Sequence, residues 1–423
     1  MPPSQTRQPA PQSLRPTPPR TVLILDDAVS FGGSIVSAAN LVRALDPGRF
    51  KAVFCTAASQ DLVRNRLQEA AGVCPVILAR KALDYARLDS VRIRLRSVEV
   101  RWLTKPIVYA LHVVRLLANV PYMLKVGIAI VRHKVDLVQF NNSFGNDEGS
   151  LVAVLLRRRV VVFFRGYEGM GALDRALILG RTRAFVAVSE HVKALAVSDG
   201  VPAERICVAT PPAISVRVEA EARGKTRGRY GIPLEAPVVG FFGRIVEWKG
   251  QLEFVRAAAL VAARVPGASF LIVGDVGDAP PDYERVVRAA AQSNGLAGRV
   301  LFAGYVDDVD AHYQAVDVVA HASIAPEPSG RVIFEAMDHG IPVVASDRGG
   351  PKEFIEDGVD GFIVDPTDAE AFAKRLVELL TDGERRRRMG DRARAKVRER
   401  YGKDPYAAAV MAAYDACLAE EIG

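Results

Sequence analysis

Short runs of β-branched and aromatic residues recur along most of the chain, separated by spacers long enough for helices. Continuous apolar runs without polar alternation are typical of strands buried on both faces of a parallel sheet. In the first half they occupy residues 21–25, 51–55, 135–140, 160–164 and 184–189, and in the second half 237–243, 270–274, 300–304, 316–320, 341–345 and 361–364. Strands that alternate with helices in this way predict doubly wound α/β sheets.

The alternation of strand and helix patterns is interrupted once, around residues 210–212, where a polar and basic stretch follows Thr-Pro-Pro. With 423 residues, the chain is long enough for two cores, so we predict two Rossmann-like domains that face each other across a central cleft. The expected divisions are a disordered Pro-rich leader (1–20), an N-terminal domain (21–212), a linker (213–235), a C-terminal domain (236–404) and a final helix (405–423) that packs back on the N-terminal domain. The leader contains no apolar run and is not expected to be a secretory signal.

Positive charge is concentrated in the first half. Residues 1–212 contain 29 Lys or Arg against 16 Asp or Glu, and residues 80–134 contain 12 against 3, interleaved with apolar and aromatic residues. One interpretation is that the stretch 80–134 lies on an anionic membrane surface, although Arg115, Asn119, Pro121 and Lys125 interrupt it too often for a spanning helix. The other is an ordinary surface helix pair that packs on its own domain. Nucleic acid is not an expected partner, because no recognition motif accompanies the charge.

The cysteines and histidines do not indicate a metal site. The four cysteines, Cys55, Cys74, Cys207 and Cys417, show no CxxC spacing, and the six histidines show no ligand spacing. We expect reduced, buried cysteines in a cytoplasmic protein, and no metal ion.

Two glutamates eight positions apart, Glu327 and Glu335, flank Gly330. The segment follows the apolar run 316–320 and opens an amphipathic helical pattern, which places Gly330 at a helix entrance. There, backbone N–H groups and the helix dipole favour a phosphate, while the two carboxylates are suited to accept hydroxyl protons from a ribose and from a second polyol. This arrangement fits a nucleotide sugar. The alternative is a loop charge and a solvated helix face.

Two cations, Arg244 and Lys249, follow Gly243 at the end of the first run of the second half. If both face one site, they neutralise a departing diphosphate; a solvated loop pair is the alternative. In the first half, Gly32 and Gly33 stand between the first apolar run and a helical pattern, as in a Rossmann-like opening.

From Val238 to Tyr401 the chain resembles the retaining glycosyltransferases of family 4, which have the two-domain GT-B fold. The resemblance includes Gly243-Arg244, Lys249-Gly250, the motif 327–337, residues 273–275, 302–306, 315–317 and 340–346, Gly349-Gly350 and residues 357–361. It implies that Arg244 and Lys249 hold the donor diphosphate, that Glu335 binds the ribose and that Glu327 contacts the transferred hexose. It also implies donor contacts from Gly243, from the amides near Gly330, Arg331 and Val332, and from a glycine loop at Gly32 and Gly33.

The first half matches this family less closely. Where many members have a histidine at the end of a middle strand, this chain has Arg165, and Glu168 follows it. We expect these two residues at the acceptor, and an anionic acceptor would suit the guanidinium. Ser329 replaces the usual aromatic residue of the motif, and Pro211-Pro212 replaces a common Asn-Gly near the hinge.

We therefore predict a metal-independent, retaining hexosyltransferase that needs no cofactor. It would transfer a hexosyl group from a nucleotide diphosphate sugar to a hydroxyl of a saccharide or lipid-linked acceptor, in polysaccharide or glycolipid biosynthesis. We expect it in the cytoplasm, with a peripheral position on the inner face of the membrane as the refinement suggested by residues 80–134. The open alternatives are a nucleotide-sugar epimerase or a phosphorylase of the same fold, and a non-catalytic component of a polysaccharide assembly complex.

Overall fold

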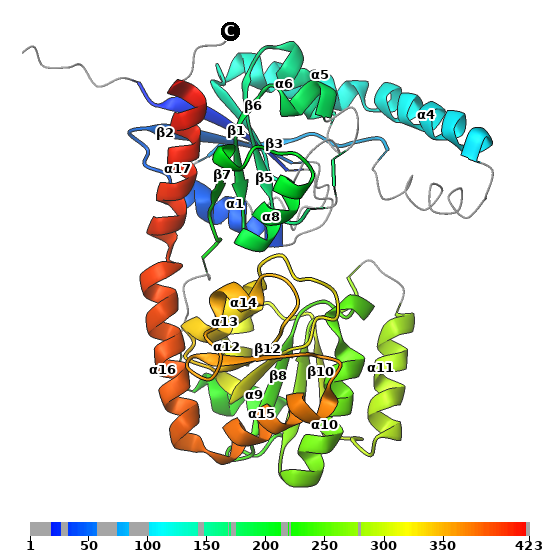
Figure 1. Ribbon diagram of the computed structural model, residues 1–423, viewed down its shortest axis with the longest axis vertical. Coiled ribbons are helices and arrows are strands. Elements are labelled where there is room, and N and C mark those ends of the chain that lie inside the picture. Colours follow the sequence, from blue (N-terminus) through cyan, green and yellow to red (C-terminus); the bar gives the residue numbers. More distant parts are fainter. Residues whose placement is uncertain are drawn as a thin grey trace, which may run out of the picture.

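The computed structural model describes residues 18–26, 33–56, 74–83, 101–142, 148–167, 169–170, 175–212, 219, 221–277 and 281–419. The expected leader lies outside these residues except for positions 18–20. Two α/β domains follow one another along the long axis of the molecule (Figure 1).

The N-terminal domain is built on a seven-stranded parallel sheet with the order β3-β2-β1-β4-β5-β6-β7. Its strands are β1 (Arg20–Asp26), β2 (Phe50–Thr56), β3 (Val76–Leu78), β4 (Leu137–Phe140), β5 (Arg159–Phe164), β6 (Thr182–Ala187) and β7 (Ile206–Val208). The five longer strands coincide with the apolar runs. The two edge strands β3 and β7 have three residues each, which is too short for a pattern to reveal them.

The C-terminal domain is built on a six-stranded parallel sheet with the order β10-β9-β8-β11-β12-β13. Its strands are β8 (Val238–Phe242), β9 (Ser269–Val273), β10 (Val300–Gly304), β11 (Val318–His321), β12 (Val343–Ser346) and β13 (Gly361–Val364). All six lie at predicted runs. Strand β12 begins only after Pro342, which has no N–H to donate to the ladder. Both sheets carry an apolar core on each face, as their continuous apolar strands require.

Helices cover both sheets. The N-terminal domain has α1 (Gly33–Ala44), α4 (Arg101–Ala118), α5 (Val120–Arg132), α6 (Gly149–Leu155), a π-helical turn (Arg175–Leu179), α8 (Glu190–Ser198) and a 3₁₀ turn (Ala203–Arg205). The C-terminal domain has α9 (Ala222–Arg229), a 3₁₀ turn (Glu247–Lys249), α10 (Gln251–Arg264), α11 (Asp282–Ser293), α12 (Val309–Ala315), α13 (Arg331–Asp338), α14 (Pro351–Phe354), α15 (Ala369–Thr381) and α16 (Gly383–Arg400). The last helix, α17 (Lys403–Ala419), follows α16 along one side of the molecule (Figure 1).

The two last helices pack on different domains. Helix α16 lies against α13 and α15 of the C-terminal domain, whereas α17 lies against α1, β5 and β6 of the N-terminal domain. Tyr414 of α17 is completely buried, and its hydroxyl donates a hydrogen bond to Gln139 of β4. The end of the chain therefore contributes to the core of the first domain.

Residues 221–235, which we expected within the linker, are built into the C-terminal domain. Helix α9 packs on α12, and Arg227 within it is only 1% exposed. Its guanidinium forms an ion pair with Asp317 (3.0 Å) and donates to the carbonyl of Ala236 (2.7 Å). Because a buried guanidinium has to be hydrogen-bonded, these contacts fix α9 on the domain, whose boundary precedes the helix. Residues 213–218 and 220 lie outside the described part of the chain.

Candidate active site

Lys249 and Glu327, 78 residues apart in the chain, form an ion pair at 2.5 Å between Nζ and Oε2. They meet because β8 and β11 are parallel neighbours, so the segments that leave the two strands emerge at the same edge of the sheet. Ile324 joins these segments further, since its N–H donates to the carbonyl of Trp248 (2.8 Å). The side chains of Lys249 and Glu327 are 14% and 10% exposed, so the pair is largely withdrawn from water.

Two further side chains reach the same carboxylate oxygen of Glu327. Ser323 donates to it at 3.0 Å, and Nε2 of His321 lies 3.4 Å from it. Burial by itself raises the pKa of Glu327, but the hydrogen bond from His321 and the charge of Lys249 outweigh burial and hold this pKa well below its usual range. Glu327 is therefore a carboxylate at neutral pH. His321 and Ser323 were not among the residues predicted from the sequence, although polar residues at the end of a buried strand were an available signal.

A pair of glycines fixes the backbone of Glu327. The N–H of Gly350 donates to the Glu327 carbonyl (2.8 Å), and Gly349 has a φ of +86°. A Cβ on Gly349 would lie 2.4 Å from the Glu327 carbonyl oxygen, closer than any side chain allows. Only glycine permits this approach, so Gly349 determines where the loop of Glu327 runs.

Gly330 stands at the entrance of α13, as predicted. Its φ of +71° suits glycine, and a Cβ there would lie 2.8 Å from Cδ1 of Ile333. Arg331 and Val332 begin the helix, where the first N–H groups have no carbonyl partner within the helix and the dipole is positive. This end of α13 offers donors for a phosphate or a sugar hydroxyl.

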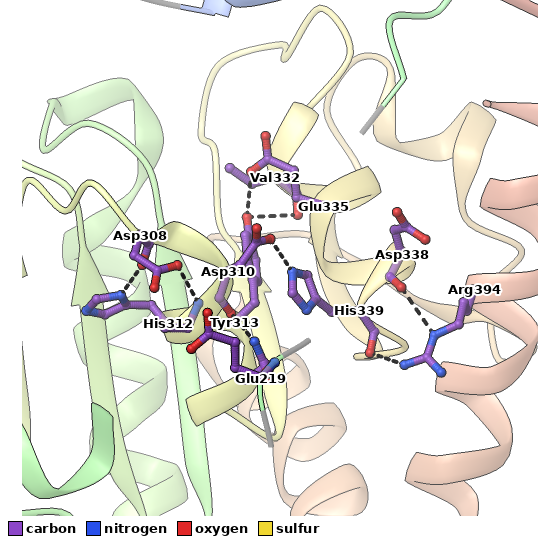
Figure 2. A network of polar contacts seen from close by, with 12 residues as sticks. Glu219, Asp308, Asp310, His312, Tyr313, Val332, Glu335, Asp338, His339 and Arg394 are labelled. Atoms are coloured by element: carbon purple, nitrogen blue, oxygen red, sulfur yellow. Dashed lines mark hydrogen bonds and ion pairs between the residues drawn. The ribbon is translucent and has the colours of Figure 1, made fainter. Parts of the chain in front are cut away.

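Glu335 is held in place by two donors. Oε2 accepts the Tyr313 hydroxyl at 2.9 Å, and Oε1 accepts Arg331 at 2.9 Å. Figure 2 shows Tyr313 reaching from α12 toward Glu335 on α13. A carboxylate accepts about four hydrogen bonds, so Glu335 has lone pairs left for ligand hydroxyls.

Tyr313 is itself fixed by stacking. Its ring is completely buried between Phe242 (3.9 Å between centroids) and His339 (5.1 Å), and Nε2 of His339 contacts Asp310 at 2.8 Å (Figure 2). Burial and the neighbouring Glu335 carboxylate raise the pKa of Tyr313 well above its usual value. The hydroxyl therefore stays protonated and donates to Glu335 over the whole physiological pH range.

Arg244 does not join the ion pair. Its side chain is exposed and has no hydrogen-bond or ion-pair partner among the residues that the structure describes. Its backbone is fixed, because Gln251 donates to its carbonyl (2.7 Å) and Gly274 packs too closely on Gly243 to carry a Cβ. Arg244 is thus a solvent-facing cation on a defined backbone, available to an anion.

The two domains touch at this site. Ser189, the N-cap of α8, donates its hydroxyl proton to the carbonyl of Pro328 (2.5 Å). The Glu353 carboxylate of α14 accepts the backbone N–H groups of Glu190 (2.7 Å) and His191 (2.6 Å). A carboxylate of the second domain therefore caps a helix of the first, and the motif with Glu327 lies at the contact between domains.

The expected site residues of the first domain are only partly described. Gly33 is the first residue of α1, whereas Gly32 and Glu168 lie outside the described residues. Arg165 donates to the side-chain oxygen (2.7 Å) and to the carbonyl (3.1 Å) of Asn141, whose amide in turn donates to Asp26. Arg165 is therefore part of a polar network at the carboxyl ends of β1, β4 and β5, and its role toward an acceptor stays a prediction.

Two parallel-sheet Rossmann-like domains, with these residues at their contact, define a GT-B protein. Residues 222–396, which include most of the C-terminal domain, match the family described as glycosyl transferases group 1. The match begins at α9, in agreement with the domain boundary seen in the structure.

Curated relatives resemble part of the chain. The lipopolysaccharide core biosynthesis glycosyltransferase LpsE of Rhizobium meliloti is 37% identical over 166 residues, which cover 39% of this chain and 46% of that protein. The GDP-mannose-dependent alpha-(1-6)-phosphatidylinositol monomannoside mannosyltransferase of Mycobacterium tuberculosis is 33% identical over 209 residues, which cover 47% and 53%. The chain thus spans about half the length of the curated relatives it matches.

A solved structure resembles the chain over nearly its whole length. Anabaena HepE, crystallised in complex with UDP-glucose, has a TM-score of 0.75 over 93% of this chain and 99% of its own. The two sequences are 23% identical, so the likeness establishes the shared two-domain fold.

Proposed function

We propose that the protein is a glycosyltransferase that transfers a hexosyl group from a nucleotide diphosphate sugar to a hydroxyl acceptor. The observation that carries this proposal is the buried Lys249–Glu327 ion pair beside the entrance of α13, within a group 1 domain. The fold places these groups where a parallel sheet ordinarily binds ligands, beyond the carboxyl ends of its strands.

In this proposal the donor diphosphate meets three sources of positive charge. Lys249 supplies a cation whose position is fixed by Glu327, and Arg244 supplies a second cation without a protein partner among the described residues. The first N–H groups of α13 supply the third. Charge that develops on the leaving diphosphate in the transition state is stabilised by such fixed groups, which is the larger part of catalysis when a leaving group becomes charged.

The sugar and the ribose meet carboxylates. Glu327, ionised by its surroundings, is placed to accept hydroxyl protons of the hexose, while Glu335, oriented by Tyr313 and Arg331, accepts those of the ribose. Nothing in these contacts selects a base. The names of the relatives include a GDP-mannose-dependent enzyme, and HepE was crystallised with UDP-glucose.

We further propose that the reaction proceeds with retention and without a metal ion. The resemblance to family 4 supports retention. Metal independence is supported by the cations and the helix end named above, which neutralise the diphosphate in place of an ion. The anomeric configuration of the product by NMR, and turnover in the presence of a chelator, test these two points separately. An inverted anomer or loss of turnover with chelator would contradict them.

The proposed acceptor is a saccharide or a lipid-linked saccharide, with Arg165 and Glu168 as acceptor-side candidates. Two relatives have names that refer to lipopolysaccharide core and to phosphatidylinositol monomannoside. Such acceptors belong to membranes, so we propose a cytoplasmic protein that works peripherally at the membrane. No described helix is both long enough and apolar enough to span a bilayer.

A thermal-shift panel with UDP, GDP, ADP and their common sugar conjugates tests the donor site. A bound nucleotide raises the melting temperature by mass action. Nucleotides of one base should therefore raise the melting temperature of the native protein most, and the same nucleotides should not raise that of Glu335→Ala. Product analysis then separates the alternatives: an epimerase converts donor without acceptor, a phosphorylase requires inorganic phosphate, and a non-catalytic component turns over nothing. A native protein that shifts with no nucleotide would contradict the proposal.

A further inference from the structure

Helices α4, α5 and α6 expose an unusual amount of apolar surface. Val113 and Leu117 of α4, Leu124, Ile128 and Val131 of α5, and Leu155 at the end of α6 are between 55% and 76% exposed. The three helices adjoin one another, because α5 packs against both α4 and α6. We call these six residues the apolar ridge. Figure 1 shows α4 extending away from the sheet of its domain.

Core packing does not account for the ridge. Helix α5 already has a buried side, formed by Tyr122, Val126 and Ile130, which joins the core of the N-terminal domain. Leu124, Ile128 and Val131 recur at intervals of four and three residues and therefore form a second apolar stripe, on the opposite side. An ordinary surface helix has one apolar stripe, so the second requires a partner outside the domain.

Among the described residues of α4, α5 and the end of α6, the exposed charges at the ridge have one sign. Lys125 and Arg132 of α5 and Arg157 after α6 are exposed, and the sequence contains no Asp or Glu from Arg101 to Lys134. Their helical positions place Lys125 and Arg132 along one edge of the Leu124–Ile128 stripe.

Not every cation of this region contributes to that surface. Arg115 and Lys81 point inward to the buried carboxylate of Glu148, at 2.8 Å and 3.5 Å. The basic surface is therefore narrower than the stretch 80–134 that the sequence suggests, and it extends beyond it to Arg157. Residues 84–100 of that stretch lie outside the described part of the chain.

We infer that the apolar ridge docks on the surface of an anionic lipid bilayer. Its apolar side chains would enter the boundary between headgroups and acyl chains, while Lys125, Arg132 and Arg157 contact lipid phosphates. A second copy of the chain is the weaker fit. A two-fold symmetric dimer through this face would bring its like charges together, whereas anionic lipid neutralises them.

This inference extends the proposed function. The binding of lipid does not depend on the proposed function, but the biological role of that binding rests on it. A docked ridge would keep the enzyme at the surface that contains a lipid-linked acceptor. Binding to lipid itself depends on neither a donor nor an acceptor, so it is measured apart from catalysis.

The test is co-sedimentation of the full chain with vesicles of phosphatidylglycerol and phosphatidylcholine, compared with phosphatidylcholine alone. We expect binding to the anionic vesicles and at least a tenfold loss of affinity for Leu124→Gln/Ile128→Gln. Lys125→Glu/Arg132→Glu should bind the anionic vesicles more weakly than the native protein, and its remaining affinity should no longer depend on salt concentration. Both double variants change exposed side chains, so their melting temperatures should match the native protein.

Val286→Gln on α11 is the matched control, because Val286 is 51% exposed on the other domain. It should bind vesicles like the native protein. Equal binding by all variants, or no binding by the native protein, would overturn the inference. A native dimer in sedimentation velocity that Leu124→Gln/Ile128→Gln converts to a monomer would instead assign the ridge to a second copy. The nucleotide thermal shift, run on the same preparations, reports separately whether the proposed donor site is present.

Discussion

Lys249 and Glu327 contact each other at 2.5 Å, although the resemblance to family 4 assigns the lysine to the diphosphate and the glutamate to the hexose. One buried ion pair therefore connects the two halves of the expected donor. The carboxylate holds the lysine in place, and the hydrogen bond from His321 together with the charge of the lysine keeps the carboxylate ionised. Changes at either residue should affect both the binding of the sugar and its departure from the diphosphate.

Lys249→Met should lower turnover about 10²- to 10³-fold, because a fixed cation near the leaving group is removed. It should also destabilise the fold by up to about 3–5 kcal/mol, since the buried Glu327 loses its lysine and keeps only the hydrogen bonds of Ser323 and His321. Steady-state kinetics and urea denaturation measure the two effects. The double variant Lys249→Met/Glu327→Gln should recover most of the stability and none of the turnover. Near-normal turnover in Lys249→Met would refute the diphosphate role.

The ion pair also predicts how stability depends on pH. The pKa of Glu327 is lower in the folded protein than in the unfolded chain, where it is about 4.3. The stabilisation by its ionised form is therefore complete above about pH 5 and is lost as the pH falls through and below the unfolded value. Urea midpoints of the native protein and of Glu327→Gln, measured from neutral to acidic pH, should converge on acidification. A constant gap between them would contradict the assignment.

Tyr313→Phe removes the hydroxyl that orients Glu335 while keeping the ring between Phe242 and His339. Loss of one hydrogen bond of about 1.5–3 kcal/mol to a charged group predicts roughly a 10- to 150-fold weaker nucleotide affinity, measured by calorimetry. Phe354→Leu, a change in the same domain core, serves as the control for general loosening. If both variants bind nucleotide equally well, Tyr313 has no positioning role.

Glu353→Gln tests the contact between the domains. Removing its charge weakens two charge-assisted hydrogen bonds to the first amides of α8, so the domains should separate more readily. We expect a larger radius of gyration by small-angle scattering and at least a several-fold lower kcat/KM. Glu356→Gln, an exposed neighbour, should change neither. Unaltered scattering and kinetics in Glu353→Gln would show that this contact does not hold the domains together.

Gly349→Ala should disturb the site through the backbone alone. The added Cβ would meet the Glu327 carbonyl at 2.4 Å in a left-handed backbone conformation, which costs at least about 1–3 kcal/mol. A lower melting temperature and a loss of donor binding are expected together. Gly277→Ala, at a similar φ of +60° but with open space around it, separates the backbone strain from the clash. Equal effects of the two substitutions would mean that the approach to Glu327 does not matter.

Much of the fold could be predicted from local patterns. A strand that is buried on both faces of a parallel sheet is apolar throughout, so β1, β4, β8 and β11 were visible as runs. The helix entrance at Gly330 could also be predicted, because a glycine between a strand and an amphipathic helical pattern is a local signal as well. Strands β3 and β7 are too short to give one.

The linker shows where local patterns fail. Arg227 lies in a polar, basic stretch that is typical of a solvated segment, yet it is buried against Asp317 and four backbone carbonyls. Two of these partners, the carbonyl of Ala315 and the carboxylate of Asp317, lie 88 and 90 residues away in the sequence. They matter because an unpaired buried guanidinium would cost several kcal/mol. No periodicity along the chain reports such a partner.

The sequence by itself determined the two doubly wound domains and the kinds of side chain that gather at their edges. Only the tertiary structure decided which of them meet. The adjacency of β8 and β11 brings Lys249 to Glu327, the close approach of Gly349 fixes the loop, and α8 and α14 join the domains at Ser189 and Glu353. Hydrophobic periodicity is a property of neighbouring residues, whereas pairing of charges across 78 positions depends on the order of strands in the C-terminal sheet.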